Sequence, residues 1–371
     1  MRKITVVGGG NIGTAMLAML SKKEQYEAVM YSSKKDIWNE TLKYKSMAAD
    51  EWKEAWGYHV TDNLENAAAE AEYVFITLPS FLREDFVYKL GRHISENCKV
   101  IFVPGCGGVE LFCKTLIKKG AVILGMDRVP CVARLAEYGK SIEFEWKNSV
   151  RLATVNKRED LDGICSELSD MLSLKVIPLD NYLSVTLTPS NQIMHPSRIY
   201  SIMKDKDIHC EFDHNILFYR EWTDQTSEIV FRCSDELMAL CKKLRAFDVI
   251  PLDVHYESDT PKKLTKKIRS ILSFKNIRSP MVQLANGNYV FDVSSRYFTE
   301  DFPYGVFILK SLSEICNLKT PMFDELIRWY EELVKEDIET NSDSRNSCYA
   351  NIAKVNGIFT REDIFNFYNI K

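Results

Sequence analysis

The chain opens with a glycine-rich turn between an apolar strand and an apolar helix. Residues 4–7 are apolar or β-branched, as in a strand buried on both faces, and residues 14–20 have the character of a buried helix. Between them stands Gly8-Gly9-Gly10-Asn11-Ile12-Gly13, which has the pattern G-x-G-x-x-G. In this setting the pattern is typical of the first strand, turn and helix of a Rossmann-type sheet. We therefore expect a doubly wound parallel sheet in the first half of the chain.

Each glycine of the pattern has its own physical role. Gly8 permits the tight turn after the strand, Gly10 lets the backbone approach a pyrophosphate, and Gly13 lets the helix pack closely on the strand. Asn11 and Ile12 open the helix, whose free amides and partial positive charge attract phosphate. We expect these five residues to bind a dinucleotide, and a glycine turn without a ligand is the alternative.

The segment after the second strand bears on which dinucleotide binds. An NAD site usually has Asp or Glu near the end of this strand, where it binds the ribose hydroxyls. Here the strand at residues 28–31 is followed by Ser32, Ser33, Lys34 and Lys35. Two hydroxyls and two cations suit a 2′-phosphate, so we predict NADP(H) as the preferred cofactor, with NAD(H) as the second choice. A solvated basic turn is the alternative interpretation.

Further strands alternate with helices through the first half. We expect strands at residues 73–78, 100–103, 121–124 and 175–179, with helices at 80–90 and 109–118. Ligands of such sheets bind beyond the carboxyl ends of the strands. Leu78 and Pro79, and likewise Gly105 and Cys106, should therefore face the cofactor. We interpret Cys106 as a small residue in a tight loop, because no histidine motif accompanies it as it would a nucleophile.

The alternation stops after about residue 183, and most of the remaining chain has helical spacing. Helices are expected at 213–247, 303–315 and 321–334, with a short last helix that starts at Thr360. The prediction is an α/β Rossmann-type doubly wound domain at residues 1–183, followed by an all-α, mainly helical catalytic domain at residues 184–371.

Two segments of the helical half carry candidate chemistry. Asn191 and His195 lie in one of them, where the following Pro196 predicts a helix break beside the histidine. Arg296 and Asp301 lie in the other, just before a helix. Hydride transfer to a carbon–oxygen or carbon–nitrogen double bond needs a proton donor, for which histidine is the usual choice. An adjacent carboxylate raises the pKa of the imidazole, and an arginine fork suits a substrate carboxylate.

Composition alone leaves both acid–base candidates open. His195 could equally be a structural histidine, and Asp301 could cap the helix that follows it. Arg134, expected in the loop after the last parallel strands, is a further candidate ligand for substrate, and a surface salt bridge is its alternative.

Together these features resemble the opine dehydrogenases, the octopine and nopaline dehydrogenase group. The resemblance rests on residues 8–13, the N-x-x-x-H-P pattern at 191–196 and the R-x-x-x-x-D spacing at 296–301, and it extends from Lys3 to about Tyr330. It implies a Rossmann domain joined to an all-helical catalytic domain. It also implies an NAD(P)H-dependent reductive condensation of a 2-oxo acid with the amino group of an amino acid.

The resemblance assigns roles to individual residues. It implies that His195 is the catalytic histidine, Asp301 its partner and Arg296 the ligand of a substrate carboxylate. Asn191 would position the histidine or the substrate. Two other functions stay open: an NADP-dependent hydroxy-acid dehydrogenase that reduces a carbonyl without an amine, and an NADP-binding sensor without catalysis.

Charge and composition limit the partners. The 48 Lys and Arg nearly balance the 52 Asp and Glu, so a nucleic-acid partner is not expected. No apolar run approaches the roughly 20 residues that cross a bilayer, so no membrane partner is expected either. The expected partners are the small-molecule 2-oxo acid and amino acid, with a homodimer as an open assembly.

The ten cysteines contain no C-x-x-C pair. We interpret them as reduced thiols of a cytoplasmic protein that pack as small apolar residues. His209-Cys210 and His214 could form a fragment of a metal site, but the missing partner pair argues against one, so no metal is predicted.

Overall fold

The computed structural model describes residues 1–338 and 352–370, and the chain divides into two compact units. The first unit comprises Met1–Thr186 together with Phe365–Lys371, and the second comprises Leu187–Ile364. The boundary expected at residues 183/184 lies just before this division. The grouping of the last residues with the first unit is not among the expectations from the sequence, and Cys348 and the polar stretch at 341–347 lie outside the described residues.

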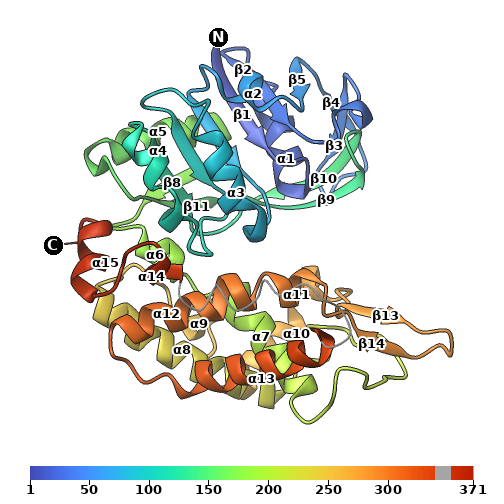
Figure 1. Ribbon diagram of the computed structural model, residues 1–371. Helices are drawn as coiled ribbons and strands as arrows, with labels where there is room; N and C mark the ends of the chain where they lie inside the picture. The colour runs from blue at the N-terminus through green and yellow to red at the C-terminus, as the bar shows by residue number, and fades with distance from the viewer. Residues whose placement is uncertain (339–351, 371) are drawn as a thin grey trace. The chain divides into compact units, whose positions relative to one another are not determined.

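The first unit is built on an eight-stranded sheet with the order β12-β11-β8-β7-β6-β1-β2-β5 (Figure 1). The strands are β1 (Arg2–Val7), β2 (Tyr26–Tyr31), β5 (Tyr58–Thr61), β6 (Tyr73–Ile76), β7 (Lys99–Phe102), β8 (Val122–Met126), β11 (Ser149–Thr154) and β12 (Lys175–Pro178). Strand β11 runs antiparallel to β8, whereas the other neighbouring pairs are parallel. The central strands are apolar and buried, because helices cover both faces of a parallel sheet. The predicted doubly wound sheet is confirmed.

Helices connect the strands of this sheet, and one more helix, α6, follows the last strand. They are α1 (Asn11–Leu20), α2 (Leu64–Ala68), α3 (Ser80–Leu90), α4 (Lys114–Lys118), α5 (Leu161–Leu172) and α6 (Leu183–Thr186), with short 3₁₀ turns at η1 (Lys35–Ile37), η2 (Val109–Phe112) and η3 (Arg158–Asp160). Helix α1 buries most of its residues, which explains its nearly uniform apolar sequence. The apolar side chains of α1 and α5 join those of the central strands in one core.

A second sheet of the first unit has the order β4-β3-β10-β9. Its strands are β3 (Leu42–Lys45), β4 (Lys53–Ala55), β9 (Cys131–Glu137) and β10 (Ser141–Trp146). The backbone N–H of Leu135 in β9 donates to the side-chain oxygen of Asn11, 2.8 Å away. This sheet, absent from the sequence-based prediction, therefore reaches the start of α1.

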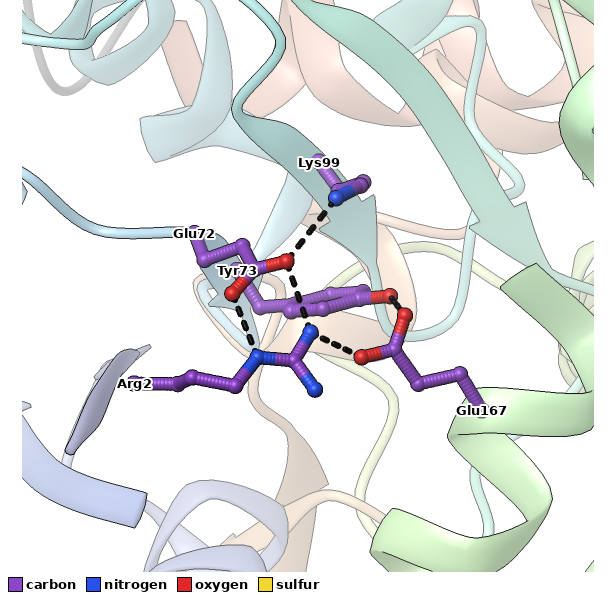
Figure 2. A network of polar contacts seen from close by, with 5 residues as sticks. All are labelled: Arg2, Glu72, Tyr73, Lys99 and Glu167. Carbon is purple, nitrogen blue, oxygen red and sulfur yellow. Dashed lines mark hydrogen bonds and ion pairs between the residues drawn. The ribbon is translucent and has the colours of Figure 1, made fainter. Parts of the chain in front are cut away.

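A network of charged groups ties α5 to the amino end of the large sheet (Figure 2). Arg2 pairs with Glu72, its Nε lying 2.5 Å from Oε2, and also with Glu167 of α5. Lys99 Nζ lies 3.1 Å from Glu72 Oε1, and the Tyr73 hydroxyl donates to Glu167. The hydrogen bond from Arg2 is the largest cause that holds the pKa of Glu72 at about 2. The network lies at the amino ends of β1, β6 and β7, whereas the glycine turn follows the carboxyl end of β1.

The second unit consists mainly of helices. They are α7 (Asn191–Met203), α8 (Asp224–Leu244), α9 (Leu252–His255), α10 (Pro261–Ser270), α11 (Arg296–Thr299), α12 (Phe307–Ile315), α13 (Pro321–Ile338) and α14 (Ile352–Val355), with a 3₁₀ turn η4 (Leu272–Phe274) and a π-helical turn η5 (Phe302–Val306). The last helix, α15 (Arg361–Phe367), begins in this unit, and its residues from Phe365 on belong to the first unit. A two-stranded hairpin of β13 (Met281–Gln283) and β14 (Tyr289–Phe291) extends from these helices (Figure 1). The prediction of an all-α domain is therefore correct in the main and wrong at this hairpin.

Two expectations about individual helices of this unit are wrong. The helix expected at 213–247 begins only at Asp224, because the segment before it forms single bridges with residues 278 and 289. Helix α7 does not break at Pro196 but continues to Met203. The proline removes one backbone hydrogen bond, and the burial of nearly the whole helix outweighs that loss.

None of the helices in the described ranges is long and apolar enough to cross a membrane. The same ranges contain no group of three or more His, Cys, Asp or Glu side chains placed to hold a metal ion.

Candidate active site

The glycine turn follows β1 at the carboxyl end of the large sheet. Gly8 has φ +103°, a conformation that side chains rarely adopt. A Cβ at Gly13 would lie 1.9 Å from the carbonyl oxygen of Gly8, so the turn and the helix approach too closely for any other residue. In contrast, a Cβ at Gly10 would meet no atom within 4 Å. The turn thus leaves open space at Gly10, as a bound pyrophosphate requires.

The start of α1 fits the phosphates of a dinucleotide. The N–H of Thr14 donates to the carbonyl of Gly10 at 2.9 Å, so the amides of the preceding turn have no acceptor within the helix. Asn11 is exposed and Ile12 half-buried. The free amides and the positive end of the helix dipole would hold a pyrophosphate here.

The loop after β2 is covered by the turn between β9 and β10. Ser32 is buried, and its hydroxyl lies 3.0 Å from the hydroxyl of Tyr138 in that turn. The Ser32 hydroxyl also accepts the backbone N–H of Lys34 at 3.2 Å. The Lys34 ammonium lies 5.4 Å from the centre of the Tyr138 ring, close enough for a cation–π contact. Tyr138 therefore fixes the loop in which the predicted 2′-phosphate ligands stand.

Ser33 and Lys35, the other two predicted residues of that loop, differ in their surroundings. Lys35 is ion-paired with Asp62, with Nζ 2.8 Å from Oδ1. Ser33 is exposed, as is Lys34. Ser33, Lys34 and Lys35 are therefore all exposed, and Lys35 is the one of the three that is ion-paired with Asp62.

A buried arginine joins the two loops predicted to face the cofactor. Arg83 of α3 donates from Nε to the carbonyl of Leu78 at 2.9 Å and from Nη1 to the carbonyl of Cys106 at 3.0 Å. Pro79 precedes α3, and Gly105 packs so closely against Gly125 that a Cβ there would lie 2.7 Å from its Cα. Arg83 was not among the sequence candidates, because an arginine in a helix ordinarily indicates an exposed face.

The structure brings His195 and Asp301 together in the helical unit. Nδ1 of His195 lies 2.7 Å from Oδ2 of Asp301, and both side chains are largely buried. Asp301 precedes η5, but in the described structure its carboxylate does not cap that turn. When Asp301 is ionised, its carboxylate can only accept hydrogen bonds. In that state Nδ1 of His195 is the donor, and Nε2 is left for other contacts.

Burial raises the pKa of Asp301, and the charge and hydrogen bond of His195 oppose that rise. The ring of Tyr297 stacks on His195 with centroids 4.3 Å apart, and Phe218 contacts it edge-on at 5.3 Å. The second nitrogen, Nε2, lies 2.8 Å from the hydroxyl of Tyr219. Tyr219 was missed in the sequence, where the aromatic cluster at 218–222 was the available signal.

The remaining candidates are exposed. The Arg296 side chain is 67% exposed and pairs with Glu300, one helical turn away. Asn191 is the exposed first residue of α7, one turn before His195. Arg134 is exposed on strand β9 of the first unit, and not in a loop as expected.

Two family models match the chain. Residues 178–334 match the alpha-helical domain of NAD/NADP octopine/nopaline dehydrogenases, and residues 3–119 match the N-terminus of NAD-dependent glycerol-3-phosphate dehydrogenases. The matched ranges contain the His195–Asp301 pair and the glycine turn, respectively.

Curated relatives align with nearly the whole chain. A tauropine dehydrogenase of Arabella iricolor is 24% identical, with 90% of this chain and 92% of that protein aligned. An opine dehydrogenase of Haliotis discus hannai is 23% identical, with 91% and 92% aligned. The solved structure of an octopine dehydrogenase with NADH and L-arginine superposes with a TM-score of 0.82 at 19% identity, and covers 98% of each chain.

The fold and the matched families define the class of the chain, an NAD(P)-dependent oxidoreductase. Within that class the chain is similar to the octopine and nopaline dehydrogenases, and the resemblance found in the sequence is confirmed.

Proposed function

We propose that the chain is an opine dehydrogenase, which joins the amino group of an amino acid to a 2-oxo acid with NAD(P)H as reductant. The observation that carries the proposal is the buried His195–Asp301 pair at 2.7 Å in the helical unit. The named activities of the tauropine, opine and octopine dehydrogenases that align along most of the chain support it.

The chemistry divides into a condensation and a reduction. The amine adds to the oxo carbon, and loss of water from the adduct gives a carbon–nitrogen double bond. The nicotinamide cofactor, when bound, supplies the hydride for the former oxo carbon. One proton is needed for the departing water and one for the nitrogen of the product, so the reaction requires a positioned acid.

His195 is suited to be that acid. As imidazolium it can release a proton, and Asp301 stabilises the charge it holds before release. The buried setting strengthens this ion pair, because little water screens it. Tyr297 and Phe218 restrict the ring to one orientation.

The exposed residues would bind the carboxylates of the substrates. Arg296 would exchange its contact with Glu300 for the carboxylate of the 2-oxo acid. Asn191 would orient His195 or the substrate from the same face of α7, and Arg134 is a further candidate carboxylate ligand.

We also propose that NADP(H) is preferred over NAD(H). Support comes from the exposed hydroxyl of Ser33 and the exposed ammonium of Lys34 after β2. The ratio of kcat/KM for NADPH to that for NADH measures the preference, and Lys34→Ala should lower this ratio. A wild-type preference for NADH would contradict the proposal.

The function is tested with a matrix of 2-oxo acids against amino acids. Oxidation of NADPH that depends on both substrates, with a product whose mass equals that of the reduced condensate, would support an opine dehydrogenase. Oxidation with an oxo acid alone, unchanged by any amine, would instead indicate a hydroxy-acid dehydrogenase. Cofactor binding without turnover across the matrix would indicate a sensor.

A further inference from the structure

We propose that Tyr219 is a proton relay between His195 and the substrate, an inference that rests on the proposed reductive function. The Tyr219 hydroxyl lies 2.8 Å from Nε2 of His195. The other ring nitrogen, Nδ1, lies 2.7 Å from Oδ2 of Asp301. Both ring nitrogens of His195 therefore have hydrogen-bond partners within the protein before substrate binds.

This arrangement limits how a proton can leave His195. Transfer through Nδ1 would deliver it to Asp301, a buried carboxylate that has to stay ionised to stabilise the imidazolium. The aromatic rings of Tyr297 and Phe218 pack against the imidazole, one stacked and one edge-on. At Nε2 the hydrogen-bond partner is the hydroxyl of Tyr219, so a proton that leaves through Nε2 passes to that hydroxyl.

A buried arginine holds the chain segment that contains Tyr219. Arg198, one turn beyond His195 on α7, donates from Nε to the carbonyl of Phe218 at 3.0 Å and from Nη2 to the carbonyl of Glu221 at 2.9 Å. These two carbonyls bracket Tyr219 in the chain. Helix α7 thus carries both the histidine and the guanidinium that holds the tyrosine segment against it.

Aromatic packing fixes the ring as well. Tyr219 stacks on Phe274 with centroids 4.2 Å apart and lies parallel to Trp222 at 6.0 Å. Burial raises the pKa of Tyr219 well above its ordinary value, so the hydroxyl keeps its proton at neutral pH. A neutral phenol both donates and accepts, which a relay needs.

The transfer balances as follows. The Nε2–H bond of the imidazolium breaks, and that proton forms a new O–H bond on Tyr219. At the same time the original O–H bond of Tyr219 breaks, and its proton bonds to the leaving oxygen or to the nitrogen of the substrate. His195 ends neutral, Tyr219 ends as it began, and the substrate has gained one proton with no change of oxidation state.

The test compares wild type with Tyr219→Phe and with a matched control, Tyr200→Phe. Tyr200 is also a buried tyrosine of this unit, and its hydroxyl donates to Glu325 at 2.5 Å. Single-turnover rates of NADPH oxidation are measured in mixtures of H₂O and D₂O, so that product release does not contribute. Thermal unfolding of each variant reports on its folding.

A relay moves two protons in one step, so the wild-type rate should fall along a curve as the D₂O fraction rises. Tyr219→Phe should lose about 10-fold to 10²-fold in rate, the scale of a lost proton-transfer group, and its remaining dependence on D₂O should be linear. Tyr200→Phe should keep both the rate and the curve. Incorporation of 3,5-difluorotyrosine at position 219, which keeps the ring and the hydroxyl, should retain the curvature that Phe loses.

Three results would overturn the relay. An unchanged rate in Tyr219→Phe would show that the hydroxyl is dispensable. A rise in kcat/KM would show that substrate displaces it from His195, and a lower rate with the curve retained would make Tyr219 a structural support. Failure of the proposed function is seen separately, as absence of amine-dependent turnover in the wild type.

Discussion

At the scale of single residues, His195 and Asp301 form a contact across 106 positions of sequence. We predict that His195→Ala lowers kcat by about 10² or more, because the reaction loses its positioned acid. The dissociation constant of NADPH should stay nearly unchanged, because the glycine turn belongs to the other unit. Steady-state kinetics and fluorescence titration with NADPH measure the two quantities, and normal turnover in the variant would remove His195 from the mechanism.

Arg296 allows a second prediction at this scale. Arg296→Ala should raise the KM of the 2-oxo acid about 10-fold or more, with a smaller effect on kcat, because a charge-assisted bond to a carboxylate is lost. Arg296→Lys should recover only part of the affinity, since an ammonium cannot form the two parallel bonds of a guanidinium. A KM that does not change in either variant would mean that the arginine serves only its ion pair with Glu300.

The sequence pointed to some of these residues and not to others for a physical reason. The patterns around His195 and Asp301 are local, so a single segment reveals each of them. Tyr219 and Arg83 act through partners 24 and 23 positions away, and those distances close only in the folded chain. Arg296 fits the R-x-x-x-x-D spacing, but this spacing does not reveal that the side chain is exposed and paired with Glu300.

At the scale of elements, close packing of the first turn on the first helix leads to a paired prediction. Gly13→Ala should destabilise the first unit and abolish NADPH binding, because the added Cβ would lie 1.9 Å from the carbonyl oxygen of Gly8. Gly10→Ala meets open space in the protein, so the variant should fold with nearly normal stability and bind NADPH more weakly. Thermal unfolding and NADPH titration separate the two effects, and equal stability of both variants would contradict this packing argument.

The predictability of the elements follows their burial. Strands β1, β6, β7 and β8 are apolar runs because the sheet is covered on both faces, and the sequence revealed them. The second sheet is covered less completely, and its strand Leu42–Lys45 alternates buried and exposed residues. This alternation is itself a signal of a half-buried strand, but the sequence-based prediction followed continuous apolar runs and missed it. Pro196 led to a wrong prediction of a helix break. Tertiary packing keeps α7 helical through this proline, although a proline in the interior of a helix ordinarily ends or kinks it.

At the scale of the whole molecule, the end of the chain joins the first unit through a buried carboxyl group. Glu110 of η2 is fully buried, and its Oε1 accepts the hydroxyls of Thr186 at 2.5 Å and of Tyr368 at 2.7 Å. Within the described residues its Oε2 has no hydrogen-bond partner. Three segments far apart in the sequence thus meet at one carboxyl group, a contact that no local pattern could predict.

This buried group makes the stability of the first unit depend on pH. Burial raises the pKa of Glu110 from 4.5 to about 6, against the opposing effect of its two hydroxyl partners. The folded state therefore holds the proton more tightly than the unfolded state. The stabilisation is complete below about pH 4.5 and is lost as the pH rises through about 6, a change of about 2 kcal/mol.

We predict that Glu110→Gln removes this dependence, because glutamine is uncharged at every pH and still offers an acceptor to Thr186 and Tyr368. Relative to wild type, the variant should gain about 2 kcal/mol between pH 4.5 and pH 7.5. Denaturant unfolding of the first unit at several pH values measures the difference, with the exposed Glu65→Gln as the control for loss of charge. A difference in unfolding free energy between variant and wild type that stays constant across this range would contradict the prediction. It would show that Glu110 has the same pKa in the folded and unfolded states.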